Sequence, residues 1–198
     1  MDIAPSFSVE EWKKLDLENN EDDWQKAVSV FKDRIYARYI DPVDLLVDAE
    51  KDVDPKNKRF GFTTLAIDLL LMETLQAFKE GLPDTSGMSA QVFKRFLEQS
   101  SRFSEYFKTE PERREFYTQF RCGILHQAEV QSSALVWSVG DLYDRTSFPH
   151  TVNRMFIHRA LKDDLDDYLK LLRDPMSKKA RTEFKKKMDA IADREAFV

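Results

Sequence analysis

Apolar residues recur along most of this chain at spacings of three and four positions, which is the pattern of amphipathic helices. The first run opens on the acidic residues 21–23, which suit a helix N-terminus, and its apolar positions recur from Trp24 to Tyr39. The strongest run, residues 59–81, is apolar around most of its circumference and ends at Gly81. A helix of that kind belongs in the middle of a bundle, so residues 59–81 are predicted to form the central helix.

Further segments continue the helical pattern. Thr109 is a candidate N-cap with Pro111 close behind it, so a helix is predicted to begin there. Residues 41–59 carry prolines and dense charge, which predicts a short helix and a loop. Residues 1–20 have weak periodicity and are expected to form an irregular lead-in. The other helical segments are residues 86–107, 109–140, 149–175 and 177–197.

The predicted fold is therefore all-α: an up-and-down helical bundle with additional terminal helices, and residues 21–194 as a single domain. Composition agrees, because 42% of the residues are hydrophobic and 15 are Phe, which is enough for a sizeable core. Only 5 Gly and 7 Pro leave little turn chemistry for a many-stranded sheet, and no strand is predicted. The net charge of −5 argues against nucleic-acid binding over the whole surface, but it leaves room for a local basic cleft.

A single cysteine, Cys122, excludes an internal disulfide framework and a cysteine-rich zinc site. It favours a reducing compartment. The first residues lack the basic and apolar regions of a secretion signal, and the most apolar run carries Asp68 and Glu73 and is too short to span a bilayer. We expect a soluble, cytoplasmic protein without a membrane partner.

Two charged clusters have ordinary interpretations beside functional ones. The acidic pairs Asp163/Asp164 and Asp166/Asp167 could suggest a metal, but on a helix with Lys162 and Lys170 a solvated outer face is the better interpretation. The basic residues of segment 178–187 could hold a phosphate backbone, with an exposed basic face as the alternative; they are Lys178, Lys179, Arg181, Lys185, Lys186 and Lys187. No phosphate-binding loop, dinucleotide motif, nucleophile elbow or zincin motif is present.

The three histidines differ in their surroundings. His150 follows Pro149 at an expected helix start and is interpreted as a surface residue. His158 lies four positions after Arg154, and an exposed polar stripe explains that pair. His126 lies in a segment with the apolar content of a core helix, where a histidine is more often structural than catalytic.

Arg121 changes the interpretation of His126. Burying an arginine and a histidine near each other costs free energy unless both side chains find hydrogen-bond partners. Five positions on a helix leave their side chains roughly 140° apart and about 7.5 Å apart along the axis. They cannot stack, but they could flank one groove. Gly123 between them would let a neighbouring backbone or a substrate come close.

The segment "FRCGILHQAE" resembles the R-x4-6-H motif of the HEPN superfamily, in particular a bacterial, often plasmid-borne group whose motif reads much like "FRNGILHQAE". "LAIDLLLMETLQAFKEG" resembles the upstream core helix of that group, and "VNRMFIHRALKDDLDDYLKLLRDP" with "FKKKMDAI" resembles its C-terminal end. The resemblance covers roughly residues 60–192. The bare spacing occurs by chance in many chains, whereas the longer block is more specific.

The resemblance implies a helical domain that dimerises, brings two copies of the motif to one cleft and cuts RNA there without a metal or other cofactor. Arg121 would hold the scissile phosphate, and His126 would exchange a proton with a ribose hydroxyl or a leaving oxygen. A toxin or phage-defence role, with an antitoxin protein as a further partner, belongs to the same expectation.

One position departs from the family pattern. The residue after the arginine is usually polar, often Asn or Asp, and here it is Cys122, a weak hydrogen-bond partner. The alternatives are therefore a catalytically silent HEPN domain that binds RNA or a protein, and a purely structural helical dimer. Candidate cleft-lining residues beside Cys122 are Gln127, Glu129 and Glu73, although Asp68 and Glu73 could equally lie on a helix surface.

Overall fold

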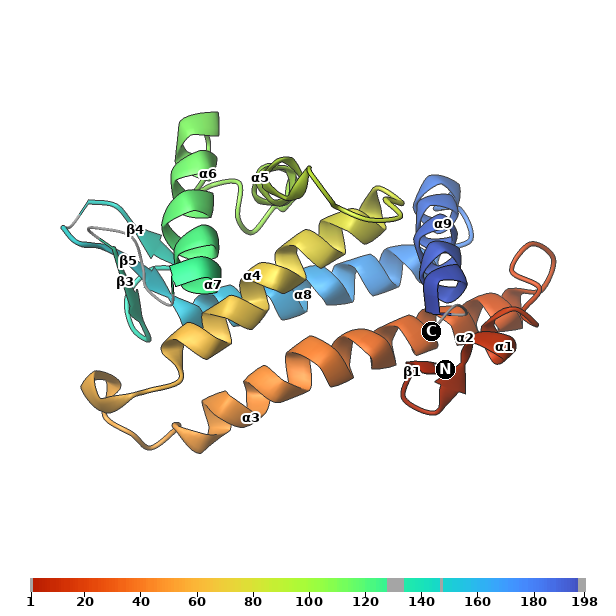
Figure 1. Cartoon of the computed structure of the whole chain (residues 1–198), viewed down its shortest axis with the longest axis horizontal. Helices are drawn as coiled ribbons and strands as arrows, with labels where there is room; N and C mark the ends of the chain where they lie inside the picture. The colour runs from red at the N-terminus through yellow and green to blue at the C-terminus, as the bar shows by residue number, and fades with distance from the viewer. Residues whose placement is uncertain (1, 128–133, 147, 196–198) are drawn as a thin grey trace.

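The computed structural model describes residues 2–127, 134–146 and 148–195. Helices make up most of these residues, so the predicted all-α class is confirmed. Figure 1 shows α2, η1 and α3 as one long rod, α4 and α8 beside it, α5 and α6 across them, and α9 near both chain ends. The longer helices are α2 (Glu21–Ile35), α3 (Asp41–Ala49), α4 (Gly61–Lys79), α5 (Ser89–Gln99), α8 (Arg154–Arg173) and α9 (Lys178–Glu195). The shorter helices are α1 (Val9–Trp12), η1 (Tyr36–Ile40), η2 (Pro55–Asn57), α6 (Glu110–Phe116), η3 (Tyr117–Cys122) and α7 (Gly123–Gln127).

α4 occupies the centre, as its apolar circumference predicts. It packs against α5, α8 and α9, and Leu65, Leu69, Met72 and Leu75 are fully buried. By length and composition α4 could cross a membrane, yet 61% of its apolar window is buried inside the fold. That burial is typical of the core helix of a soluble protein.

Aromatic side chains bind the helices together at both ends of α4. Phe184 of α9 contacts the rings of Phe31 and Phe78, with centroid distances of 5.3 and 6.2 Å. Near the small sheet, Phe116 packs against Phe107 and Phe120 at 4.7 and 4.9 Å. Because these rings come from α2, α4, α6, η3 and α9, the core joins elements that are distant in sequence.

The rod formed by α2, η1 and α3 contains a π-helical turn just before Pro42. Proline has no N–H to donate to the carbonyl four residues earlier, and its ring crowds that carbonyl, so a wider turn at η1 lets the helix continue. The acidic start of α2 is capped by Asn20, whose side chain accepts hydrogen bonds from the N–H groups of Asp22 and Asp23. The short helix expected near Pro42 is α3, and the loop follows it.

The predicted helix over residues 109–140 is wrong for residues 134–140, which are not helical. Residues 134–137 form strand β3 (Ala134–Trp137), which pairs in parallel with β5 (His150–Asn153), and β4 (Tyr143–Asp144) pairs antiparallel with β5. His150 therefore lies in a strand, not at a helix start. Such short strands carry too few residues for a period-two pattern to be recognised.

The lead-in is also more regular than its weak periodicity suggests. β1 (Asp2–Ala4) and β2 (Phe7–Ser8) form a hairpin, and α1 follows with a capping box between Ser8 and Glu11. Ile3, Val9 and Trp12 are buried in the main core. Burial against α2 and α9 decides the conformation of this segment.

The prediction that Arg154 and His158 form an exposed polar stripe is wrong, because both side chains are buried. Asp68 and Glu73 are buried as well, so neither lies on a helix surface. Their charges require partners inside the fold, and those partners lie on other helices.

Candidate functional site

The segment that carries Arg121 is a π-helix, η3, that runs directly into α7. Phe116, Phe120 and Ile124 are spaced by four positions and face the core. Their burial fixes the rotation of the segment, so Arg121 lies beside this apolar face and not at its centre. Single π-turns are rare and occur frequently at functional sites.

Arg121 is held by Glu73 of α4. One guanidinium nitrogen donates to Glu73 Oε2 at 3.1 Å, and the two side chains are only 13% and 10% exposed. Glu73 Oε1 accepts hydrogen bonds from the hydroxyl groups of Thr85 and Ser89 at 2.6 and 2.7 Å. The carboxylate thus joins α4, the following loop, α5 and η3, and it balances the charge of Arg121.

A tyrosine completes the surroundings of Arg121. The guanidinium carbon lies 5.6 Å from the centre of the Tyr117 ring, one helical turn earlier. Burial is the main cause that raises the pKa of Tyr117, and the nearby Cys122 thiol adds to it. Cys122 itself is a free thiol and is partly exposed.

The structure brings Arg121 and Glu73 together in an ion pair, and Cys122 follows Arg121 at the end of η3. The backbone of His126 and Gln127 continues α7, while their side chains and all of Glu129 lie outside the described part of the chain. Within the described residues, no group of three or more His, Cys, Asp and Glu side chains could hold a metal ion.

A second polar cluster surrounds His158. Its Nδ1 lies 2.8 Å from Asp68 Oδ1, and its Nε2 lies 3.1 Å from Asp44 Oδ1. Lys162 donates to the other oxygen of Asp44 at 2.6 Å. The cluster therefore joins α8 to both α4 and α3.

The titration of this cluster follows from its burial. Burial raises the pKa of Asp68 to about 6, although the hydrogen bond from His158 opposes that change. Burial alone would lower the pKa of His158, but its hydrogen bonds with Asp68 and Asp44 raise it above the ordinary 6.5. Asp44 has a lowered pKa because hydrogen bonds from Lys162 and His158 outweigh its partial burial.

One turn earlier on α8, Arg154 donates to Glu50 Oε2 at 2.7 Å, and the two side chains are 2% and 6% exposed. The other oxygen of Glu50 accepts hydrogen bonds from the N–H groups of Arg59 and Phe60. Sequence reasoning missed both clusters. The available signal was the spacing of Arg154, His158 and Lys162 by four positions, together with Asp68 inside an otherwise apolar helix.

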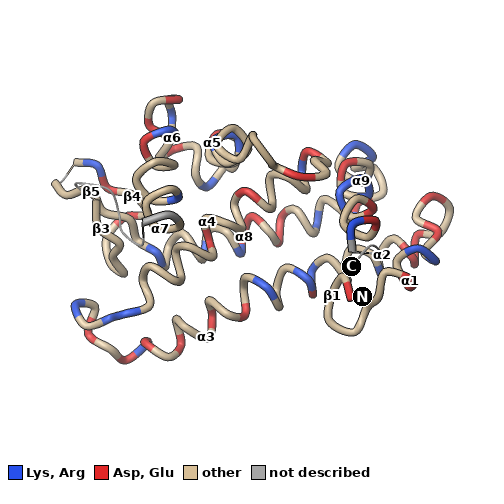
Figure 2. The backbone as a smooth tube through the Cα atoms, viewed as in Figure 1, with Lys and Arg blue, Asp and Glu red and all other residues tan. Residues whose placement is uncertain are grey.

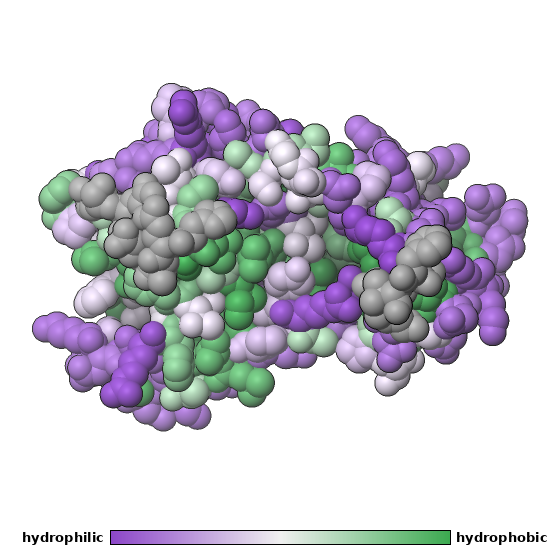
Figure 3. Space-filling view, in the orientation of Figure 1, coloured by the Kyte–Doolittle hydropathy of each residue, from purple (hydrophilic) through white to green (hydrophobic). Residues whose placement is uncertain are grey.

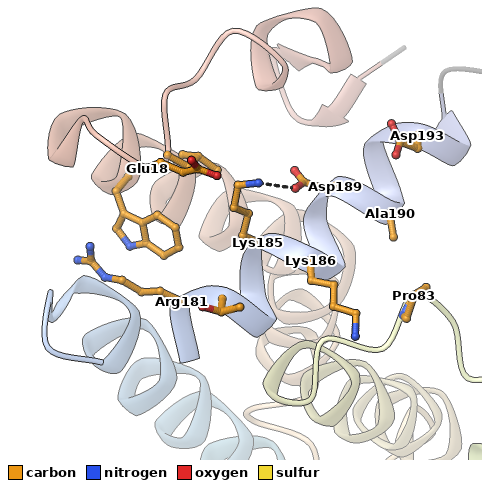
Figure 4. Close-up of a pocket in the computed structure, with 11 residues that line it drawn as sticks. Glu18, Pro83, Arg181, Lys185, Lys186, Asp189, Ala190 and Asp193 are labelled. Carbon is orange, nitrogen blue, oxygen red and sulfur yellow. Dashed lines mark hydrogen bonds and ion pairs between the residues drawn. The ribbon is translucent and has the colours of Figure 1, made fainter. Parts of the chain in front are cut away.

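A pocket of about 620 Å³ lies along α9 beside the loop before α2. Figure 4 shows Arg181 beside the indole ring of a tryptophan that lines the pocket, and Lys185 directed at Asp189. Arg181 lies 4.7 Å from the centre of the Trp24 ring and forms an ion pair with Glu21 at 2.7 Å. Lys185 pairs with Asp189 at 3.0 Å, so much of the positive charge in this pocket is already balanced.

The pocket bears on the predicted basic segment 178–187. Lys187 is buried and donates to the carbonyl oxygen of Pro83, so it does not face solvent. Figure 2 shows acidic and basic residues interspersed along α9 and along the other helices. Lys187 therefore departs from the exposed-face interpretation, while the ion pairs of Arg181 and Lys185 leave less positive charge for a phosphate. In the acidic segment, Asp164 is buried and pairs with Arg102, which also contacts Asp163 and Asp167.

The fold and the site together define an all-α protein with an arginine–carboxylate pair at a π-helical turn. No family model, no curated protein and no solved structure matches the chain. The geometry at Arg121 and the motif around it are therefore the basis for a functional proposal.

Proposed function

We propose that the chain is a metal-independent HEPN endoribonuclease that uses Arg121 and His126. The observation that carries the proposal is the orientation of Arg121 by Glu73 and Tyr117, at the end of a π-helix that continues into the helix bearing His126. An arginine fixed before substrate arrives needs little reorganisation to stabilise developing charge on a phosphate.

The proposed reaction uses the hydroxyl group of the RNA itself. The ribose 2′-oxygen attacks the adjacent phosphorus, the bond from phosphorus to the 5′-oxygen breaks, and the products are a 2′,3′-cyclic phosphate and a 5′-hydroxyl. His126, as a residue that titrates near neutral pH, would accept the 2′-hydroxyl proton or donate one to the leaving oxygen. Guanidinium N–H groups of Arg121 that do not bind Glu73 would donate to the phosphate.

A homodimer would supply a second histidine, so that one acts as base and the other as acid. Apolar side chains are available on the surface for an interface, since Leu45, Phe62 and Leu70 are 71%, 42% and 37% exposed. Figure 3 shows apolar side chains gathered over α4 on the viewed face. A cytoplasmic toxin or phage-defence effector, with an antitoxin protein as partner, is the cellular role we propose.

The second candidate is a catalytically silent HEPN domain that binds RNA or a protein. It is favoured by the Arg121–Glu73 pair, in which the charge of the arginine is already balanced, and by Cys122 in place of the usual polar residue. A phosphate would have to compete with Glu73 for the same guanidinium group.

The deciding experiment measures RNA cleavage in EDTA by the purified protein and by three variants. His126→Ala should lower the rate by about 10² to 10⁴, because general acid–base catalysis is lost. Arg121→Ala should lower it by about 10² or more, because one charge-stabilising donor group is lost. Arg114→Ala, which removes an exposed arginine of α6, is the matched control and should leave the rate unchanged.

Equal cleavage by the parent protein and His126→Ala would refute the site assignment. Cys122→Asn separates the two candidates, because it restores the usual polar residue after the arginine. RNA that is bound but never cut, even by this variant, would favour the silent binding domain.

A further inference from the structure

We propose that Asp44, His158 and Asp68 form a proton-dependent clamp that holds α3 against α4 and α8, and that loss of one proton loosens α3. The clamp is independent of the proposed ribonuclease activity. It rests on three observations: the position of His158 between two carboxylates, the difference in burial between those carboxylates, and the sparse apolar anchoring of α3.

The first observation concerns hydrogen-bonding capacity. Both ring nitrogens of His158 lie within hydrogen-bond distance of a carboxylate oxygen, at 2.8 and 3.1 Å. An ionised carboxylate only accepts hydrogen bonds, and a neutral imidazole has a single N–H to donate. Both contacts are therefore made only when the cluster holds two protons, as an imidazolium between two carboxylates or as a neutral imidazole beside one protonated acid.

The second observation indicates which of the two contacts of His158 is lost when the cluster gives up one of its two protons. The Asp68 side chain is 1% exposed and has no access to water, so it retains the remaining N–H of His158. The Asp44 side chain is 39% exposed and can turn to solvent when a nitrogen lone pair replaces the N–H that it faced. The contact that breaks is therefore the one made by α3.

The third observation is that α3 has little other anchoring. Val43 is its only buried apolar residue, while Leu45 is 71% exposed. Besides the clamp, α3 is held through Lys162 on Asp44, and the residue after its end, Glu50, is held by Arg154. Among the groups that tie α3 to the rest of the fold, His158 is the one whose ordinary pKa lies near neutral pH.

The groups that face His158 favour this assignment. Asp44 approaches from α3, Asp68 from α4, and Lys162 from the next turn of α8. From η1, Tyr36 interacts electrostatically with Asp44 and Lys162, and burial raises its pKa, so it stays neutral in the pH range of interest. Asp41 and Asp166 interact electrostatically with Tyr36, and Glu50 pairs with Arg154 one turn earlier on α8.

The direction of the pH effect follows from linkage. The clamped state binds a proton more tightly than the released state, because the contact with Asp44, which only the clamped state has, is one of those that raise the pKa of His158. The contact is fully present below the pKa of His158 in the released state. It is lost as the pH rises through the pKa in the clamped state, which lies above 6.5. Between those two values the opening of α3 should increase up to about tenfold for each pH unit.

The test is amide hydrogen exchange of the full chain from about pH 6 to pH 9, corrected for the intrinsic pH dependence of exchange. Amides of α3 should lose protection as the pH rises, while those of α4 and α8 should not. His158→Gln removes the titrating group and should abolish the pH dependence in α3. Lys162→Met is the matched control: it should lower protection of α3 at every pH and keep the dependence, shifted to higher pH.

A measurement on the parent protein does not depend on the folding of a variant. Nitrogen NMR of the His158 ring should show both ring nitrogens protonated at pH 6, or one protonated nitrogen beside a protonated Asp68. A pH-independent α3, a pH dependence that survives His158→Gln, or a ring with one protonated nitrogen beside two ionised carboxylates would each overturn the proposal.

Discussion

At the scale of single residues, Glu73 organises the candidate site. Its two oxygens accept hydrogen bonds from Arg121, Thr85 and Ser89, so a carboxylate of the central helix determines where the guanidinium lies. A carboxylate in an apolar helix is costly unless such partners are present. Glu73 is therefore both a structural link and a positioning residue for the proposed phosphate site.

Replacing Glu73 with Gln should lower the free energy of unfolding by about 3 kcal/mol, because the charge of Arg121 is left buried without a counter-charge. Denaturant unfolding measures this change. Glu98→Gln is the matched control, since the Glu98 side chain is 54% exposed in its pair with Arg113 and its loss should cost less than about 1 kcal/mol. The expectation would be contradicted if the two variants lost the same stability.

At the scale of elements, the start of α6 shows local sequence acting as predicted. Thr109 caps the helix, with its side chain accepting from Glu112 N–H and Glu112 accepting from Thr109 N–H, and Pro111 stands in the first turn. The predicted N-cap is confirmed. The cap matters for the site because α6 continues directly into η3 and Arg121.

Thr109→Ala should lower the free energy of unfolding by about 1 kcal/mol, because an N–H group of the first turn loses its acceptor. Thr109→Ser keeps the oxygen and should be close to neutral. Thr118→Ala, at an exposed threonine of η3, serves as control and should change stability by less than about 0.5 kcal/mol. Thermal or denaturant unfolding distinguishes these outcomes, and equal losses for Thr109→Ala and Thr118→Ala would speak against a role for the cap.

At the scale of the whole molecule, the shared site of the proposed ribonuclease requires two chains. Sedimentation at tens of micromolar should therefore show a dimer. Mixing His126→Ala with Arg121→Ala subunits should restore part of the cleavage activity if each site takes residues from both chains. A monomer at that concentration, or no recovery on mixing, would count against a shared site.

Local sequence is sufficient to predict the features that depend on neighbours along the chain. Helical periodicity from Trp24 to Tyr39, the apolar circumference of residues 59–81 and the cap at Thr109 are local signals, because residues three or four apart share one helix face. The fold class, the central position of α4 and the helix that carries Arg121 follow from them.

Only the tertiary structure decided which polar groups meet. Glu73 reaches Arg121 across 48 positions, and Asp68 reaches His158 across 90. It also decided that β3 is a strand, since a strand is stabilised by its partner and residues 134–137 have theirs in β5. Pairings of this kind depend on how helices and strands pack in space, and the spacing of residues along a chain does not contain that information.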